Sequence, residues 1–205
     1  MEIVVGGHIC LDIIPEWKKG GIESIKPGQL LEMDGIEFSV GGAVTTGLAL
    51  HKLGVNTGVT GKIGDDAIGK ITVDILKEYN EKIVDNMIIS SEETSSYTVV
   101  INPPDTDRVF LHFPGTNNTF QAQDLNYDEL NSKLFHFGYP PLMAEMYKNE
   151  GREVKKIFQN LKEREIVTSL DMAMPDPESE AGQVDWVEIL KNSLPEVDVF
   201  LPSID

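Results

Sequence analysis

Residues 39–54 read SVGGAVTTGLALHKLG, and this stretch decides how the rest of the chain is interpreted. A strand-like segment runs into Gly41 and Gly42 and then into an apolar-periodic segment that ends at Gly54. A strand–glycine–helix connection of this kind brings backbone N–H groups to a ligand at the N-terminus of the helix. The ligand could be a phosphate, a dinucleotide or an uncharged molecule, and the residues around this connection indicate which.

The composition limits the class of protein and its partners. The chain has 205 residues, enough for one sizeable core, and its 34 acidic and 17 basic residues give a net charge of −17. Because such a surface repels nucleic acid and anionic membranes, we expect neither as a partner. Cys10 is the only cysteine, and no signal peptide or membrane-length apolar run is present, which together favour a cytoplasmic protein.

Short, nearly continuous apolar segments alternate with amphipathic ones. Strands are expected at 2–7, 57–64, 133–138, 166–172 and 197–201. Helices are expected at 65–80, with an aspartate as N-cap, at 152–165 and at 184–194. This order predicts right-handed βαβ crossovers and a mainly parallel sheet covered by helices. At the last strand we expect Val197, Val199 and Leu201 to be exposed or to leave an open sheet edge.

Two stretches leave this rhythm. Residues 12–40 are rich in glycine and lack a helix period, and residues 95–114 look like two strands joined at the turn PPDTD. We expect both to pair into a small antiparallel sheet that stands off the main domain as a lid. Its exposed apolar face, which favours burial against a second subunit, has as candidates Val99, Ile101, Phe110 and Phe113.

Two segments resemble known phosphate-binding motifs but lack the residues that those motifs need. The segment GDDAIGKI, Gly64 to Ile71, resembles a Walker loop, but Ile71 stands where a Ser or Thr should hold magnesium. Its two aspartates would also repel phosphates. We therefore expect Gly64 to end a strand, an aspartate to cap the next helix and Gly69 to lie within that helix. No dinucleotide fingerprint follows the glycines of residues 6–7.

Asp12 and the glycine pair remain as a candidate site. Asp12 follows the first strand, at the edge of a parallel sheet where ligands bind. Its carboxylate can accept hydrogen bonds from vicinal hydroxyls, and the amides of Gly41 and Gly42 can donate to oxygens. The alternative is that Asp12 ends a strand and the glycines only form a turn.

No metal site is expected from the histidines. They lie far apart in the sequence and show no ligand spacing; they are His8, His51, His112 and His136.

Seven segments in order resemble the ribokinase-like (PfkB) carbohydrate kinase family over essentially the whole chain. They read VVGGHICLDII, SVGGAVTTGLALHKLG, VTGKIGDDAIGK, RVFLHFPGTNNTF, LFHFGYP, TSLDMAMPDP and VDVFLPSID. The resemblance is to the N-terminal portion of the family, so residues 1–205 would form one truncated domain. It implies a three-layer αβα sandwich with a mainly parallel sheet and a β-sheet lid that often forms a homodimer interface.

The resemblance also implies an activity, phosphoryl transfer from magnesium-ATP to a hydroxyl of a sugar or nucleoside. Asp12, Gly41 and Gly42 would grip the sugar. The candidate substrate-binding set further includes Thr46, Phe110 and Tyr139, and Ser203 is the candidate cofactor-binding residue. The family's catalytic aspartate, its anion hole and most of its site for ATP and Mg²⁺ would lie beyond residue 205.

The chain departs from the family in ways that affect the substrate and the activity. Thr45 or Thr46 stands where many members have an asparagine that bonds a sugar hydroxyl, and Cys10 replaces a sugar-binding asparagine of ribokinases, which argues against ribose. Without the catalytic segment we expect no phosphorylation by this chain alone. The alternatives are a non-catalytic sugar- or nucleoside-binding module and an interaction role through the lid sheet.

Overall fold

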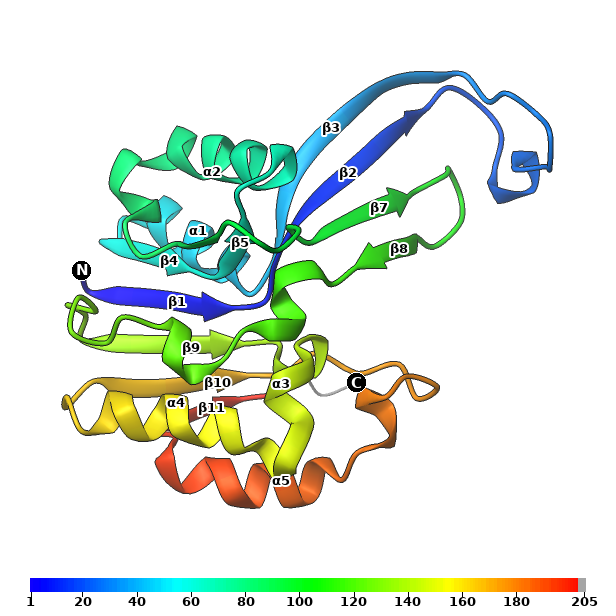
Figure 1. The fold of residues 1–205 in the computed structure, drawn as a ribbon. Coiled ribbons are helices and arrows are strands. Elements are labelled where there is room, and N and C mark those ends of the chain that lie inside the picture. The colour runs from blue at the N-terminus through cyan, green and yellow to red at the C-terminus, as the bar shows by residue number, and fades with distance from the viewer. Residues whose placement is uncertain (203–205) are drawn as a thin grey trace.

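A parallel sheet forms the centre of the computed structural model, which describes residues 1–202 (Figure 1). Its strands are β1 (Ile3–Gly7), β4 (Thr57–Thr60), β9 (Leu134–Gly138), β10 (Val167–Asp171) and β11 (Val199–Leu201). They lie in the order β11-β10-β9-β1-β4, and every pairing is parallel. The predicted parallel sheet is therefore confirmed.

Helices cover both faces of this sheet. They are α1 (Val44–Lys52), α2 (Ala67–Tyr79), α3 (Ala144–Tyr147), α4 (Arg152–Lys162) and α5 (Trp186–Ser193). One core joins α1 and α2 to Val59 of β4, and the other joins α4 to Phe135 and Phe137 of β9. The structure therefore has the three αβα layers that the sequence indicates (Figure 1).

The helix periods predict burial well in one helix and less well in another. In α4 all four apolar residues of the stripe are buried, namely Val154, Ile157, Phe158 and Leu161. In α2 the buried face centres on Gly69, Thr72 and Leu76, while Ile71 is only half-buried. The α2 face is turned because Gly69 lies against the carbonyl of Gly64, where a Cβ would be 2.1 Å from the oxygen.

Short 3-10 turns complete the connections. They are η1 (Ile22–Ser24), η2 (Glu81–Val84), η3 (Gly115–Thr119), η4 (Ala122–Asp124), η5 (Pro140–Leu142), η6 (Lys148–Gly151), η7 (Ala181–Gln183) and η8 (Leu194–Glu196).

The segment 57–64, expected as one strand, is divided at Gly61. After β4 the chain turns into β5 (Lys62–Gly64), which pairs in parallel with β6 (Ile88–Ser90) in a separate two-stranded sheet. A Cβ at Gly61 would lie 2.6 Å from the Ile9 side chain, so a glycine allows the close approach at this bend.

A second sheet projects from the main one at the carboxyl end of β1 (Figure 1). Its strands are β2 (Ile9–Trp17), β3 (Met33–Gly42), β7 (Tyr97–Ile101) and β8 (Val109–Phe113), in the order β3-β2-β7-β8. We call it the projecting sheet. Its outer pairs are antiparallel as expected, but β2 and β7 at its centre are parallel, so the sheet is mixed.

The strand register separates a polar from an apolar face of the projecting sheet. Tyr97 pairs with Phe113 and Val99 with Leu111, whereas Val100 pairs with Phe110. Successive side chains of a strand point to opposite faces. Phe113 therefore belongs to the apolar face with Val99 and Ile101, and Phe110 points to the other face. The expectation that these four residues share one face was wrong for Phe110, because 110 and 113 differ by an odd number.

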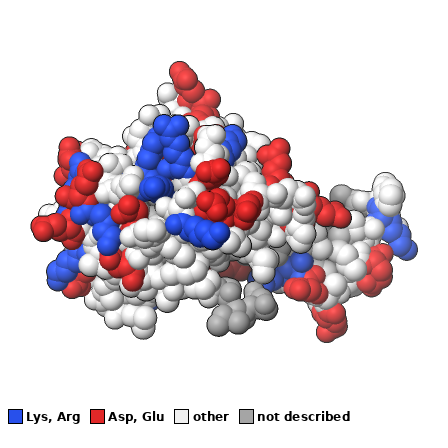
Figure 2. All heavy atoms as spheres, turned by 90° about the horizontal axis from the view of Figure 1, so that it is seen from below, with Lys and Arg blue, Asp and Glu red and all other residues white. Residues whose placement is uncertain are grey.

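Strand β11 lies at the edge of the main sheet among the described residues. Val199 and Leu201 are 39% and 57% exposed, as expected, while Val197 is partly buried against the core. Figure 2 shows the molecule from below the view of Figure 1, and acidic and basic side chains are interspersed on the surface seen there. None of the helices within residues 1–202 has the length and apolar character that crossing a membrane requires.

Asp66 caps α2 and also holds the start of β7. One of its carboxylate oxygens accepts from the N–H of Gly69 at 2.8 Å, and the other accepts from the N–H of Ser95 at 2.8 Å. Partial burial is the largest single influence and raises the pKa of Asp66, but the hydrogen bonds from Gly69 and Ser95 together outweigh it and hold that pKa below its usual value. Gly64 ends β5 and Gly69 lies in α2, so the structural reading of the Walker-like segment is confirmed.

Replacing Asp66 with Asn should lower the free energy of unfolding at pH 7 by about 1 kcal/mol. The amide would place a donor against the N–H of one partner. Because the folded pKa is depressed, the wild-type advantage is present above about pH 4 and is lost as the pH falls through the folded pKa. In denaturant unfolding, the free energies of the wild type and of Asp66→Asn should therefore differ at pH 7 and become equal toward pH 2. The exposed neighbour Asp65 is the control, and equal losses for Asp65→Asn and Asp66→Asn would contradict the prediction.

Candidate functional site

The pairing of β2 with β3 brings Asp12 against a bare glycine. Cys10 lies opposite Gly41 in the antiparallel register, and Asp12 lies opposite Ser39. A Cβ at Gly41 would lie 2.5 Å from one carboxylate oxygen of Asp12 and 2.8 Å from the other. The two residues singled out in the sequence are therefore in direct contact, and only glycine leaves room for the carboxylate in this position.

Gly42 makes the turn from β3 into α1. Its φ is +88°, a left-handed conformation that favours glycine, and a Cβ there would lie 2.4 Å from the carbonyl oxygen of His8. The hydroxyl of Thr45 donates to the Gly42 carbonyl at 2.8 Å. Thr46 lies half-buried in the first turn of α1. The glycine pair and Thr46 thus lie together at the start of one helix.

A row of polar side chains crosses the projecting sheet on the face that carries Asp12. Asp12 is opposite Thr98, which in turn is opposite His112. The thiol of Cys10 donates to Asp12 at 3.3 Å, and Thr98 lies 3.5 Å from the same sulfur and 2.9 Å from Nδ1 of His112. One connected chain of contacts therefore runs from His112 on β8 to the carboxylate of Asp12 on β2.

Burial sets the protonation of this row. Burial, and then the nearby Asp12 charge, raise the pKa of the Cys10 thiol to about 12. Burial also raises the pKa of Asp12, against hydrogen bonds from Cys10 and Thr98 that lower it. The pKa of His8 falls to about 3, first from burial and then from His112. At neutral pH the site therefore holds a neutral imidazole and a protonated thiol beside Asp12.

His8 and His112 meet although 104 positions separate them. Their Nε2 atoms lie 3.4 Å apart, because His8 follows β1 and His112 sits on the hairpin that packs beside β2. Two histidines that lie far apart in the sequence are therefore neighbours in the structure. His8, Thr98 and His112 were all missed as site residues, and no sequence period or spacing could have found them.

Asn117 is a further residue that sequence reasoning missed. It is fully buried, and its side-chain amide both accepts from the N–H of Ile9 at 3.1 Å and donates to the carbonyl of Ile9 at 2.8 Å. The first residue of β2 is thus fixed to the segment that follows β8.

The remaining candidates lie around this centre. Tyr139 has a left-handed φ of 63° and follows Gly138. Gly138 packs closely on Ala43, since a Cβ at Gly138 would lie 2.6 Å from the Ala43 Cβ. Tyr139 therefore reaches the same edge of the main sheet as the glycine turn. Phe110 is 54% exposed on the Asp12 face of the projecting sheet, farther from its root. Ser203 lies outside the described residues.

Comparison with known proteins identifies the family. The model of the pfkB family carbohydrate kinases matches residues 2–202. The chain belongs to this family. Fructokinase-2 of Oryza sativa subsp. japonica is 25% identical over 146 residues, which cover 70% of this chain and 41% of that protein. Probable fructokinase-5 of Arabidopsis thaliana is 28% identical over 147 residues, covering 70% and 43%. The chain spans about half the length of the curated relatives it matches.

Solved structures of the ribokinase fold superpose on nearly the whole PfkB chain. Arabidopsis thaliana ribokinase complexed with ribose and ATP gives a TM-score of 0.70 at 18% identity, covering 98% of this chain and 59% of that one. Fructokinase with bound ATP from Xylella fastidiosa gives 0.72 at 16% identity, covering 97% and 56%. At these identities the likeness establishes the fold alone.

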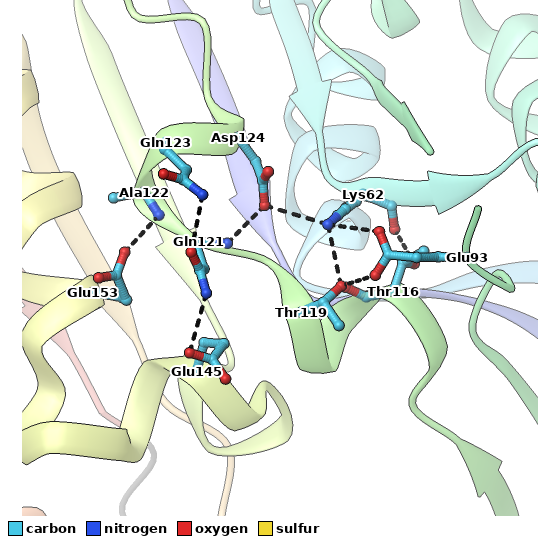
Figure 3. A network of polar contacts seen from close by, with 10 residues as sticks. All are labelled: Lys62, Glu93, Thr116, Thr119, Gln121, Ala122, Gln123, Asp124, Glu145 and Glu153. Atoms are coloured by element: carbon cyan, nitrogen blue, oxygen red, sulfur yellow. Dashed lines mark hydrogen bonds and ion pairs between the residues drawn. The ribbon is translucent and has the colours of Figure 1, made fainter. Parts of the chain in front are cut away.

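In this PfkB chain a buried lysine anchors the root of the projecting sheet (Figure 3). Lys62 of β5 makes an ion pair with Glu93 at 2.7 Å and one with Asp124 at 3.6 Å, and it donates to Thr119 at 3.1 Å. Thr119 also bonds Glu93, and Thr116 donates to the Lys62 carbonyl. Because Glu93 precedes β7 and the two threonines follow β8, one side chain ties both ends of that hairpin to β5.

The contacts continue toward the helices on the other face of the main sheet. Asp124 accepts from the N–H of Gln121 at 2.8 Å, and the Gln121 side chain donates to Glu145 of α3 at 3.3 Å. Glu153 of α4 accepts from the N–H of Ala122 at 3.0 Å (Figure 3). These contacts fix the root of the projecting sheet to the helical layer that contains α3 and α4.

Replacing Lys62 with Met should lower the free energy of unfolding by about 2 kcal/mol, since two partly buried carboxylates lose their cation. Lys70→Met is the matched control, because the Lys70–Asp65 pair is 70% and 58% exposed and should contribute less than about 0.5 kcal/mol. Denaturant unfolding at pH 7 measures both. Equal losses for the two variants would show that the Lys62 contacts do not stabilise the root.

Proposed function

We propose that this chain carries the sugar-binding part of an ATP-dependent carbohydrate kinase, which phosphorylates a hydroxyl of its substrate. The observation that carries the proposal is the contact of the Asp12 carboxylate with bare Gly41 beside the Gly42 turn. Membership of the PfkB family supports the reaction class, and the fructokinase names of its relatives make a ketose the first substrate to test.

The proposed binding chemistry follows from the groups present. The half-buried carboxylate of Asp12 accepts hydrogen bonds from neighbouring hydroxyls, and hydrogen bonds to a charged acceptor are stronger than neutral ones. Gly41 and Gly42 let the ligand approach the backbone without a side chain between. Thr46 at the start of α1 and Tyr139 beyond β9 would lie beside the same ligand. Phe110, on the Asp12 face, would cover the ligand from the projecting sheet.

Among the described residues, we identify no group of side chains for ATP comparable to the one proposed for the sugar. ATP with Mg²⁺ supplies the transferred phosphoryl group in this chemistry. The one segment of phosphate-loop pattern, Gly64 to Lys70, has the Asp66 carboxylate at the N-terminus of α2, where a phosphate would have to lie. This segment is therefore not proposed to bind ATP.

The projecting sheet would serve as both lid and contact between two copies of the chain. On its apolar face Phe38, Ile13, Val99 and Leu111 form one row across all four strands, since each is opposite the next. Phe38 is 42% and Leu111 56% exposed. Burial of such a continuous apolar row favours association of two sheets.

Sugar binding tests the proposal directly. Titration calorimetry with fructose, ribose, glucose and a nucleoside should show binding of at least one of them. Asp12→Asn should weaken that binding roughly ten- to hundred-fold, because a charge-assisted hydrogen bond is lost. Gly41→Ala should also weaken it, since the added Cβ displaces the carboxylate.

The matched control is Asp34→Asn, because Asp34 is an exposed aspartate on β3. This variant should bind the sugar as the wild type does. Circular dichroism confirms that each variant folds. Absence of binding to the whole panel, or equal effects of Asp12→Asn and Asp34→Asn, would overturn the proposal. Binding of the nucleoside alone would move the substrate to that class.

Association through the apolar row has its own test. Sedimentation velocity should show a dimer at micromolar concentration, and the double substitution Phe38→Glu with Leu111→Glu should weaken it at least tenfold by burying charge. Val187→Glu, on a residue of α5 that is 63% exposed, is the control and should not change the dimer. A wild-type monomer at these concentrations would reject this interface.

A further inference from the structure

Three side chains with metal-binding atoms converge at the base of the projecting sheet. They are His8, Cys10 and His112, and their ligand atoms all lie within 4.8 Å of one another. His8 and Cys10 flank the start of β2, while His112 comes from β8. The proposed sugar contacts use Asp12 and the glycine turn, and this cluster lies beside them through Cys10.

The separation of the two imidazoles fits a shared ion. Their Nε2 atoms are 3.4 Å apart. Two nitrogens bound to one tetrahedral Zn²⁺, at the usual Zn–N distance, are separated by about 3.3 Å. A hydrogen bond between nitrogens prefers a shorter distance. The spacing of the two nitrogens is therefore compatible with both rings binding one metal.

The surroundings prepare His112 for this role. Nδ1 of His112 lies 2.9 Å from the hydroxyl of Thr98, and when Nδ1–H donates there, the lone pair of Nε2 points toward His8. Metal-binding histidines usually have such a partner on the second nitrogen, which fixes the tautomer and the ring orientation. His112 is exposed, whereas His8 and Cys10 are buried, so an ion can enter from the His112 side.

We propose that His8, Cys10 and His112 form a binding site for a borderline-soft divalent transition metal of the Zn²⁺ type. Two imidazoles and one thiolate suit such ions and not Mg²⁺ or Ca²⁺, which prefer oxygen ligands. On binding, two metal–nitrogen bonds and one metal–sulfur bond form, and the thiol proton of Cys10 is released to solvent. Three protein ligands leave the fourth tetrahedral position open, as in metal sites that bind a water or another ligand.

The site adjoins the residue proposed to grip the sugar. The sulfur of Cys10 lies 3.3 Å from a carboxylate oxygen of Asp12, to which its thiol donates. A cation on that sulfur removes the thiol donor and attracts the carboxylate. Bound metal should therefore weaken sugar binding, a consequence that rests on the proposed function.

Metal uptake by residues 1–205 tests the site without reference to sugar. The chelator-treated protein should take up one equivalent of Zn²⁺ in competition with a chromogenic chelator, and excess Mg²⁺ should not displace it. Cys10→Ser and His112→Gln should each weaken the affinity at least tenfold. His51→Gln is the matched control, because His51 contacts the Tyr79 carbonyl away from the site. The Zn²⁺ affinity of this variant should equal that of the wild type.

A spectroscopic measurement on the wild type needs no variant. Co²⁺ in place of Zn²⁺ should give the intense visible bands of a tetrahedral site and a thiolate-to-cobalt charge-transfer band in the near ultraviolet. Lack of uptake at 100-fold excess, lack of the thiolate band, or uptake that persists unchanged in both ligand variants would overturn the proposal. Loss of sugar binding on adding Zn²⁺ would support the link to Asp12. Metal uptake without that loss would reject the link and leave the metal site standing.

Discussion

The site depends most on the register between β2 and β3. Pairing of Cys10 with Gly41 puts the Asp12 carboxylate where a Cβ of residue 41 would otherwise be. A shift of one residue would turn Asp12 to the apolar face of the projecting sheet, because side chains alternate along a strand. Buried Leu11 opposes that shift, since the shift would move its side chain to the polar face. Apolar burial on one face therefore fixes the polar geometry on the other.

The projecting sheet is held firmly at its root, and the residues proposed to contact a ligand lie just above the root. Lys62 ties both ends of the β7–β8 hairpin to β5, and Asp66 joins α2 to Ser95, shortly before that hairpin. Asn117 fixes the first residue of β2. The outer parts of the sheet have no such ties among the described residues, and Phe110 there is exposed. A base held by these contacts would suit the proposed lid, because it keeps Asp12 in place.

One polar face supports both proposals. Cys10 stands between them: its thiol donates to Asp12, and its sulfur lies near both histidines. Burial keeps this thiol protonated, so in the metal-free chain the group acts as a weak donor to the carboxylate. A metal ion replaces that proton and changes the charge beside Asp12. Cys10 would thus couple the two proposed sites through a single hydrogen bond.

The sequence by itself determined the parallel sheet and its helical layers, and it singled out Asp12 and the glycine pair as candidates. Apolar runs and helix periods report burial directly, and a glycine pair before a helix signals a close approach of backbone. The tertiary structure alone decided the break of 57–64 at Gly61, the parallel pairing of β2 with β7, and the face to which Phe110 points. It also brought His112 to His8. Contacts between residues a hundred positions apart depend on strand order and register, which no local pattern encodes.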